Sequence, residues 1–109
     1  MESGHEARKA RNEALFREVN ENIVGLARDL GGTAVYDFIC ECANSDCYER
    51  VPLTLAEYDG IRGDGTHFLL APGHEDPAIE RVVADRGAHV VVEKQGVAAV
   101  VAATADPRS

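Results

Sequence analysis

The chain has 109 residues, a length that fits one domain with a modest hydrophobic core. Its net charge is −8, and an acidic surface repels phosphate backbones and anionic lipids, so nucleic acid is not expected as a partner. The N-terminal residues are charged and the longest aliphatic run, at 97–103, is too short to span a bilayer, so we expect a cytoplasmic protein without membrane contacts.

A long helix is predicted from about residue 10 to Leu30, following a flexible tail at 1–8. Its apolar residues recur in steps of three and four, which is helical periodicity: Phe16, Val19, Ile23, Leu26 and Leu30. Gly31 and Gly32 should end the helix. We expect the apolar stripe to face the core. The alternative hypothesis is that Phe16, Val19 and Ile23 bind a protein partner, or a second copy in a homodimer.

The remaining elements are short and mostly extended. Strands are predicted at 35–42, 51–53 and 67–71, and a capping box at Thr54 and Glu57 predicts a helix that ends near Ile61 or Arg62. A hairpin of strands 79–84 and 88–94 is preferred over a helix that begins at Asp76-Pro77. Residues 97–103 fit either a strand or a short helix, and 105–109 is a second flexible tail. The pattern predicts a single α+β domain over 1–109, with the long helix packed on a small, mostly antiparallel sheet.

All three cysteines lie within ten residues, in the spacing C-x-C-x4-C from Cys40 to Cys47. On a strand, Cys40 and Cys42 point to the same side, about 6.5–7 Å apart along the chain, which is at the upper limit for a disulfide. Two thiolates converge more easily on one Zn²⁺, because each Zn–S bond is about 2.3 Å long. The polar turn at 43–46 can return Cys47 as a third ligand. This pattern predicts a structural zinc knuckle.

Zinc usually takes four ligands, and the sequence offers several candidates for the fourth. His74 lies in a loop shaped by Pro72, Gly73 and Pro77, after a strand that can pair beside the cysteine strand. The other candidates are His67, His89, Asp46 and Glu75. The remaining carboxylates of this region, Glu41 among them, are expected to be solvated surface charge.

Several motifs together resemble a family of small uncharacterised bacterial proteins. They are Arg11–Asn20 (RNEALFREVN), Phe38–Cys42 (FICEC) with Cys47, Leu53–Tyr58 (LTLAEY), Pro72–Glu75 (PGHE) and Val91–Lys94 (VVEK). The resemblance covers nearly the whole chain and implies no reaction. It does imply that His74 is the partner of the three cysteines.

These observations predict a non-enzymatic zinc-binding module that acts as an adaptor or regulatory protein through protein–protein contacts. Zinc would be structural, bound by Cys40, Cys42, Cys47 and His74, and no catalytic residue is predicted. The first alternative is a thiol-based redox sensor or metal-responsive sensor, since clustered thiols can pair on oxidation. The second is a small cysteine-dependent or zinc-dependent enzyme, since a thiolate beside an imidazole is an activated nucleophile.

Overall fold

The computed structural model describes residues 2–31, 33–42, 44, 46, 47 and 49–108, with side chains in the first helix from residue 12 onward. In chain order its elements are α1 (Glu2–Asp29), β1 (Val35–Ile39), β2 (Arg50–Thr54), α2 (Leu55–Ile61), β3 (His67–Leu70), β4 (Glu80–Asp85), β5 (Val90–Lys94) and α3 (Val97–Thr104). The predicted α+β class is therefore confirmed, as are the hairpin and the short capped helix. Residues 97–103, which fitted either a strand or a short helix, lie in helix α3.

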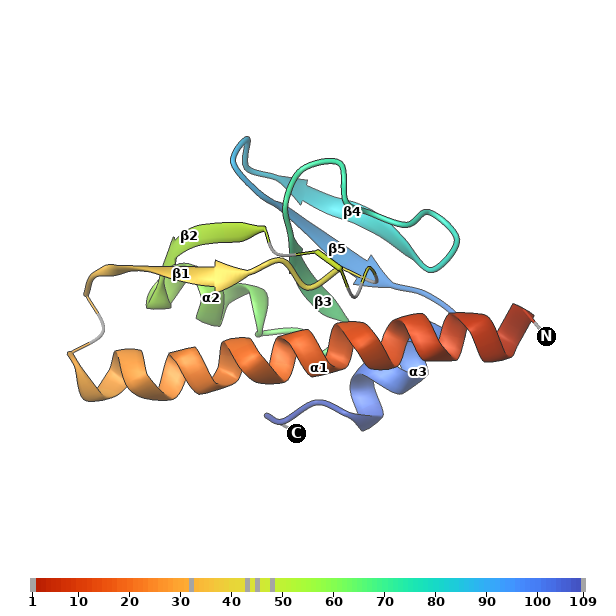
Figure 1. Cartoon of the computed structure of the whole chain (residues 1–109), viewed down its shortest axis with the longest axis horizontal. Helices are drawn as coiled ribbons and strands as arrows, with labels where there is room; N and C mark the ends of the chain where they lie inside the picture. The colour runs from red at the N-terminus through yellow and green to blue at the C-terminus, as the bar shows by residue number, and fades with distance from the viewer. Residues whose placement is uncertain (1, 32, 43, 45, 48, 109) are drawn as a thin grey trace.

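In the described part of the chain, five strands form two antiparallel sheets, one with the order β1-β2 and one with the order β3-β5-β4. The two residues that follow β1, Cys40 and Glu41, connect the two sheets through backbone hydrogen bonds. Cys40 donates its backbone N–H to Glu49 at 3.0 Å, which prolongs the first sheet, and Glu41 donates to Leu69 at 2.8 Å, which reaches the second. Figure 1 shows both sheets on one side of the long α1 helix, with α3 against it. Cys40 and Glu41 thus lie where the two sheets meet.

The long helix differs from the prediction in its start and in its buried face. It begins at Glu2 rather than near residue 10, and it ends at Asp29 with Gly31 in the left-handed conformation at φ +98°. The predicted core stripe is largely solvent-exposed: Val19 is 41% exposed, Leu26 65% and Leu30 77%. Only Phe16 and Ile23 of that stripe are half-buried.

The buried face of α1 is displaced by one residue from the apolar stripe, a rotation of about 100°. From residue 12 onward, where side chains are described, it consists of Glu13, Ala14, Arg17, Asn20, Val24 and Ala27. The polar members have partners: Arg17 donates to the carbonyls of Gly65 at 2.6 Å and Ala102 at 2.7 Å, and Lys94 forms ion pairs with Glu13 and Glu80. Since paired groups can be buried at little cost, the polar network rather than the apolar stripe orients the helix.

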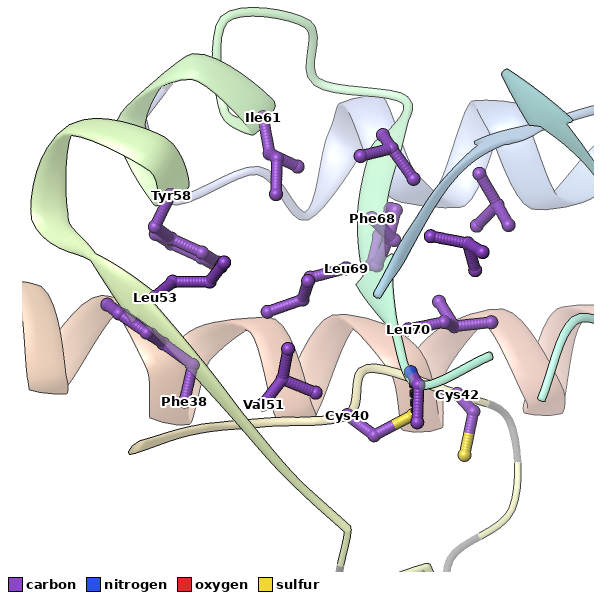
Figure 2. Packing of buried hydrophobic residues seen from close by; sticks show 14 of the residues in the cluster. Phe38, Cys40, Cys42, Val51, Leu53, Tyr58, Ile61, Phe68, Leu69 and Leu70 are labelled. Atoms are coloured by element: carbon purple, nitrogen blue, oxygen red, sulfur yellow. Dashed lines mark hydrogen bonds between the residues drawn. The ribbon is translucent and has the colours of Figure 1, made fainter. Parts of the chain in front are cut away.

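The apolar core lies between α1, α2 and the two sheets, as Figure 2 shows. Phe38 stacks on Tyr58, with ring centroids 4.5 Å apart, and Leu69 and Leu70 of β3 are fully buried beside them. Cys40 and Cys42 complete the same core at its edge. The core therefore holds the segment just after β1, which carries the first two cysteines, whereas the predicted strand extended to residue 42.

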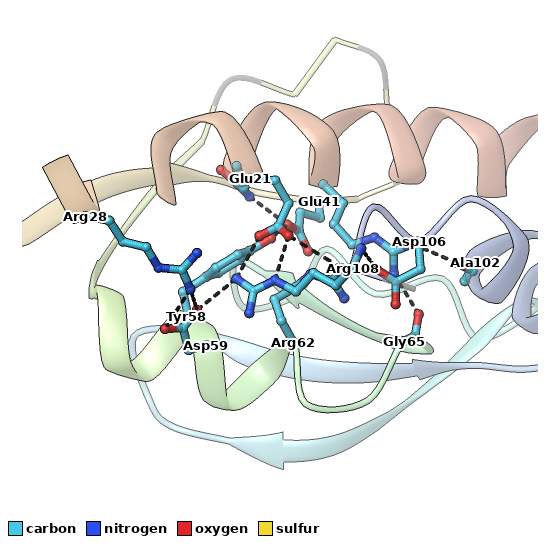
Figure 3. A network of polar contacts seen from close by, with 12 residues as sticks. Glu21, Arg28, Glu41, Tyr58, Asp59, Arg62, Gly65, Ala102, Asp106 and Arg108 are labelled. Atoms are coloured by element: carbon cyan, nitrogen blue, oxygen red, sulfur yellow. Dashed lines mark hydrogen bonds and ion pairs between the residues drawn. The ribbon is translucent and has the colours of Figure 1, made fainter. Parts of the chain in front are cut away.

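The C-terminal residues 105–108, predicted as a tail, make specific contacts. Asp106 pairs with Arg62, and Arg108 donates to Glu21 at 2.6 Å and to Asp59 at 2.8 Å. Figure 3 shows this chain of ion pairs running from α1 across to α2. Within the described part of the chain, no helix has the length and apolar character needed to cross a membrane.

Candidate metal centre

Four side chains from two distant segments form one cluster. Cys40 and Cys42 follow β1, Cys47 lies in the connection to β2, and His74 lies in the loop after β3. One sulfur or nitrogen atom from each of the four lies within 4.8 Å of all the others. The three cysteines are free thiols. The structure thus brings together the three predicted cysteines and the predicted histidine.

The distances within this cluster match a shared coordination sphere. The Nδ1 atom of His74 is 3.7 Å from the Sγ atom of Cys40 and 3.5 Å from that of Cys47. Zn–S bonds of about 2.3 Å and a Zn–N bond of about 2.0–2.1 Å place adjacent S and N ligands of a tetrahedron about 3.6 Å apart. The four donor atoms could therefore hold one cation with little rearrangement.

Glu41 fixes the extended segment that carries the first two cysteines, directly after β1. Side chains alternate along an extended chain, so Glu41 points away from the sulfurs and into the molecule. Its buried carboxylate accepts hydrogen bonds from Asn20 at 2.7 Å, from Tyr58 at 2.5 Å and from the backbone of Leu69 at 2.9 Å. Three donors on one carboxylate tie the strand to α1, α2 and β3, and this holds Cys40 and Cys42 in place.

A tight turn returns His74 toward the cysteine strand. Gly73 has φ +84° and His74 donates its backbone N–H to Ala71 at 3.2 Å, with Pro72 as the first central residue. This is the pattern of a type II turn, which requires a positive φ at its third position and so favours glycine. Ala71 also donates its N–H to the Cys40 sulfur at 3.2 Å. The same residue therefore anchors both halves of the cluster.

Cys47 is positioned by a local turn of its own. It donates its backbone N–H to Asn44 at 3.0 Å, while the Asn44 side chain accepts from Asp46 at 2.9 Å. Residues 43 and 45 of the predicted turn, and residue 48, lie outside the described residues. The described part places Cys47 on the outer side of the cluster, where it and His74 are half-buried, whereas Cys40 and Cys42 are buried.

The pKa values of the three thiols shift in different directions because the thiols form hydrogen bonds with one another. A hydrogen bond from Cys40, supported by His74, lowers the pKa of Cys42 to about 5. The same pairing with Cys42, together with burial, raises the pKa of Cys40, and burial raises that of Cys47. A bound cation would replace the remaining protons, since metal ligation requires thiolates and a neutral imidazole nitrogen.

The other ligand candidates lie elsewhere. His67 is on β3 beside Glu93 at 3.3 Å, and His89 is a buried residue before β5 near Glu57. Asp46 and Glu75 are exposed. Among the described residues, His74 is the only histidine in the cysteine cluster.

Sequence reasoning missed the residues that support the cluster. Glu41 was expected to be surface charge but is fully buried, and Asn20 and Tyr58 were assigned no part in the site. Strand alternation carried a usable signal for Glu41, because two cysteines on one side place the intervening residue on the other. Nothing in the local sequence indicates that α1 and α2 supply its hydrogen-bond donors.

Fold and cluster together define a small α+β domain with a Cys₃His group suited to binding a metal. Searches of protein-family models, curated proteins and solved structures found no match to the chain.

Proposed function

We propose that the protein is a non-enzymatic zinc-binding module that serves as an adaptor or regulatory protein. The observation that carries the proposal is the convergence of Cys40, Cys42, Cys47 and His74 at ligand-to-ligand distances suited to a tetrahedral ion. Zn²⁺ fits this donor set because structural zinc sites typically have four ligands that are cysteine thiolates and histidine imidazoles.

Structural zinc would act by tying the cysteine connection to the loop after β3. The N–H of Ala71 already donates to the Cys40 sulfur between these two segments, and a shared ion would add metal–ligand bonds between them. An ion that binds the folded chain and not the unfolded one adds its binding free energy to folding. A domain of 109 residues has a modest core, so such a contribution matters.

The apolar face of α1 supports a role in protein–protein contact. Leu15, Val19, Leu26 and Leu30 are exposed, and Phe16 and Ile23 are half-buried beside them. Contiguous exposed apolar residues on a helix are typical of interaction surfaces. The residues first proposed for partner binding, Phe16, Val19 and Ile23, thus form one margin of a wider apolar face.

A thiol-based or metal-responsive sensor is the second candidate function. It is favoured by the position of Cys47, which is half-buried, whereas Cys40 and Cys42 are buried. Peroxide would convert the Cys47 thiol to a sulfenic acid, which condenses with a neighbouring cysteine thiol to form a disulfide and release water. The disulfide would remove two ligands and release the metal.

Metal analysis of protein purified without a His-tag tests the zinc site. We expect one zinc per chain, a lower melting temperature in chelator, and loss of zinc from His74→Ala. His89→Gln is the control, because His89 belongs to none of the described groups of side chains that could hold an ion, and the variant should retain zinc. Metal-free wild-type protein whose melting temperature is unchanged by chelator and by added zinc would refute the proposal.

A further inference from the structure

A pocket of about 790 Å³ is lined by residues of β2, α2 and the β4–β5 hairpin, together with His67 at the start of β3. Apolar walls are provided by Leu53, Ile61, Val83 and Val91. Pockets of about 300–1,000 Å³ with apolar walls and a few polar groups are the usual sites for small ligands. This pocket shares no residue with the thiol cluster, so it is a separate candidate site.

An irregularity in β4 shapes one wall of the pocket. Val83 and Ala84 both line it, although neighbouring residues on a regular strand point to opposite faces. The pairing of β4 with β5 shifts register between Val82 and Ala84, which is the pattern of a β-bulge. Bulges redirect side chains and are common beside active sites. The bulge therefore allows two consecutive apolar residues of β4 to face the same pocket.

His89 is a buried wall residue whose ring has no partner. It is 8% exposed, and its ring nitrogens form no hydrogen bond within the described part of the chain, whereas His67 contacts Glu93 at 3.3 Å. Buried polar side chains nearly always have a hydrogen-bond partner, so an unpartnered imidazole that lines a pocket points to a ligand. Burial lowers the pKa of His89, so at neutral pH the uncharged ring can donate through one nitrogen and accept through the other.

The pocket is also lined by one acid and one base, Glu57 and Arg86. Glu57 accepts the backbone N–H of Thr54 through Oε1 at 2.9 Å. Arg86 forms no ion pair with any described residue, and in this it differs from Arg28, Arg62, Arg81 and Arg108. Glu57 and Arg86 do not pair with each other either, yet both charges act on the ring of His89. Two opposite charges that line one pocket without pairing suit a ligand that carries both.

We propose that this pocket binds a small zwitterion with an apolar body, the chemical class of the apolar amino acids. Arg86 would hold the carboxylate of the ligand, Glu57 its ammonium group, and His89 would donate to the carboxylate. The apolar walls would cover the side chain of the ligand. A ligand with a single charge would engage only one of the two charged groups. The inference does not depend on the proposed zinc site.

Calorimetric titration of the full-length protein with L-leucine and with L-phenylalanine tests the inference. We expect saturable binding of one molecule per chain, with a dissociation constant of about 1 mM or lower for at least one of the two. The N-acetyl derivative of the amino acid that binds lacks the ammonium group, and its amide lacks the carboxylate. Each derivative should bind about fivefold more weakly or worse, because a charged contact at a partly exposed site is worth about that much.

Arg86→Gln and Glu57→Gln test the two charged groups, and each should weaken amino acid binding about fivefold or more. Glutamine can replace glutamate in a capping box, so Glu57→Gln should retain α2. The matched controls are Arg50→Gln and Glu18→Gln, which remove the same charges from exposed positions outside the pocket and should bind as the wild type does. Zinc content should be the same in all four variants, so weaker amino acid binding cannot be attributed to the thiol site.

Three outcomes would overturn the inference. The first is a dissociation constant above about 1 mM for both amino acids, which is too weak for a dedicated site. The second is an N-acetyl or amide derivative that binds as tightly as the free amino acid, which would indicate the end of a peptide as the ligand instead. The third is binding that either Arg86→Gln or Glu57→Gln leaves unchanged, or that the control substitutions weaken equally, which is adventitious association at another place.

Discussion

His74 Nδ1 lies 3.5 Å from the sulfur of Cys47, although 27 residues separate the two in the chain. The contact exists because the turn at Gly73 brings His74 toward the cysteines, and because buried Glu41 holds the segment that carries Cys40 and Cys42. Each of these supports can be removed without touching a donor atom, so their effects on the cluster can be measured.

Gly73→Ala tests the turn that positions His74. Gly73 has φ +84°, where a side chain is strained by about 1–2 kcal/mol, and no atom lies close enough to clash with an added methyl group. We expect a loss of about that much unfolding free energy in urea titrations and weaker zinc retention against a chelator.

Gly25→Ala provides the opposite case. Gly25 lies inside α1 with free space around it, so alanine should raise the unfolding free energy by up to about 1 kcal/mol. Equal effects of the two substitutions would contradict the role assigned to the turn.

Tyr58→Phe tests the carboxylate that holds the cysteine strand. It removes the 2.5 Å hydrogen bond to buried Glu41, and loss of one partner of a buried polar group costs about 1–3 kcal/mol. We expect destabilisation of that size by chemical denaturation, together with faster zinc release. Tyr36→Phe, at a half-buried tyrosine of β1 whose hydroxyl has no hydrogen-bond partner among the described residues, should change little. If Tyr36→Phe lowers the unfolding free energy as much as Tyr58→Phe does, the hydrogen bonds to Glu41 are not the cause of the destabilisation.

The buried pair of carboxylates on Lys94 predicts a pH dependence. Burial raises the pKa of Glu13 to about 8, with Lys94 opposing and Glu80 adding to the shift. The folded state therefore binds a proton more tightly than the unfolded state. The stability that Glu13 contributes is fully present below its ordinary pKa of 4.5 and is lost as pH rises through 8.

Glu13→Gln isolates this contribution. Between pH 6 and 8 the variant should gain stability relative to the wild type, with a slope of up to about 1.4 kcal/mol per pH unit. Urea denaturation of both zinc-loaded proteins at several pH values measures it. Parallel curves for the two proteins would show that Glu13 does not titrate in this range.

Substitutions on α1 test which face of the helix is buried. Leu26→Ser should change the unfolding free energy by less than about 0.5 kcal/mol, because Leu26 is largely exposed. Val24→Ala should cost about 2 kcal/mol, because Val24 is in the core and its truncation leaves a cavity. Thermal melts of the two variants give the comparison. A larger loss of stability for Leu26→Ser than for Val24→Ala would mean that the apolar stripe predicted from periodicity is the buried face after all.

Much of the fold and site could be read from local pattern. The capping box at Thr54 and Glu57 gave the start of α2, and Pro72-Gly73 gave the turn that carries His74, because both depend on a few adjacent residues. The cysteine spacing indicated a cluster, since strand alternation fixes which side chains share a face. These features are decided within about one turn or one strand of chain.

What the sequence by itself determined was the type and order of the short elements and the chemistry gathered around Cys40 and Cys47. Only the tertiary structure decided which face of α1 is buried and which histidine meets the sulfurs. Periodicity shows that a helix has an apolar side but not whether that side or a partnered polar side is in contact with the sheet. In this chain Arg17, Asn20 and Glu13 find their partners on segments distant in sequence, so the polar side is the one that packs.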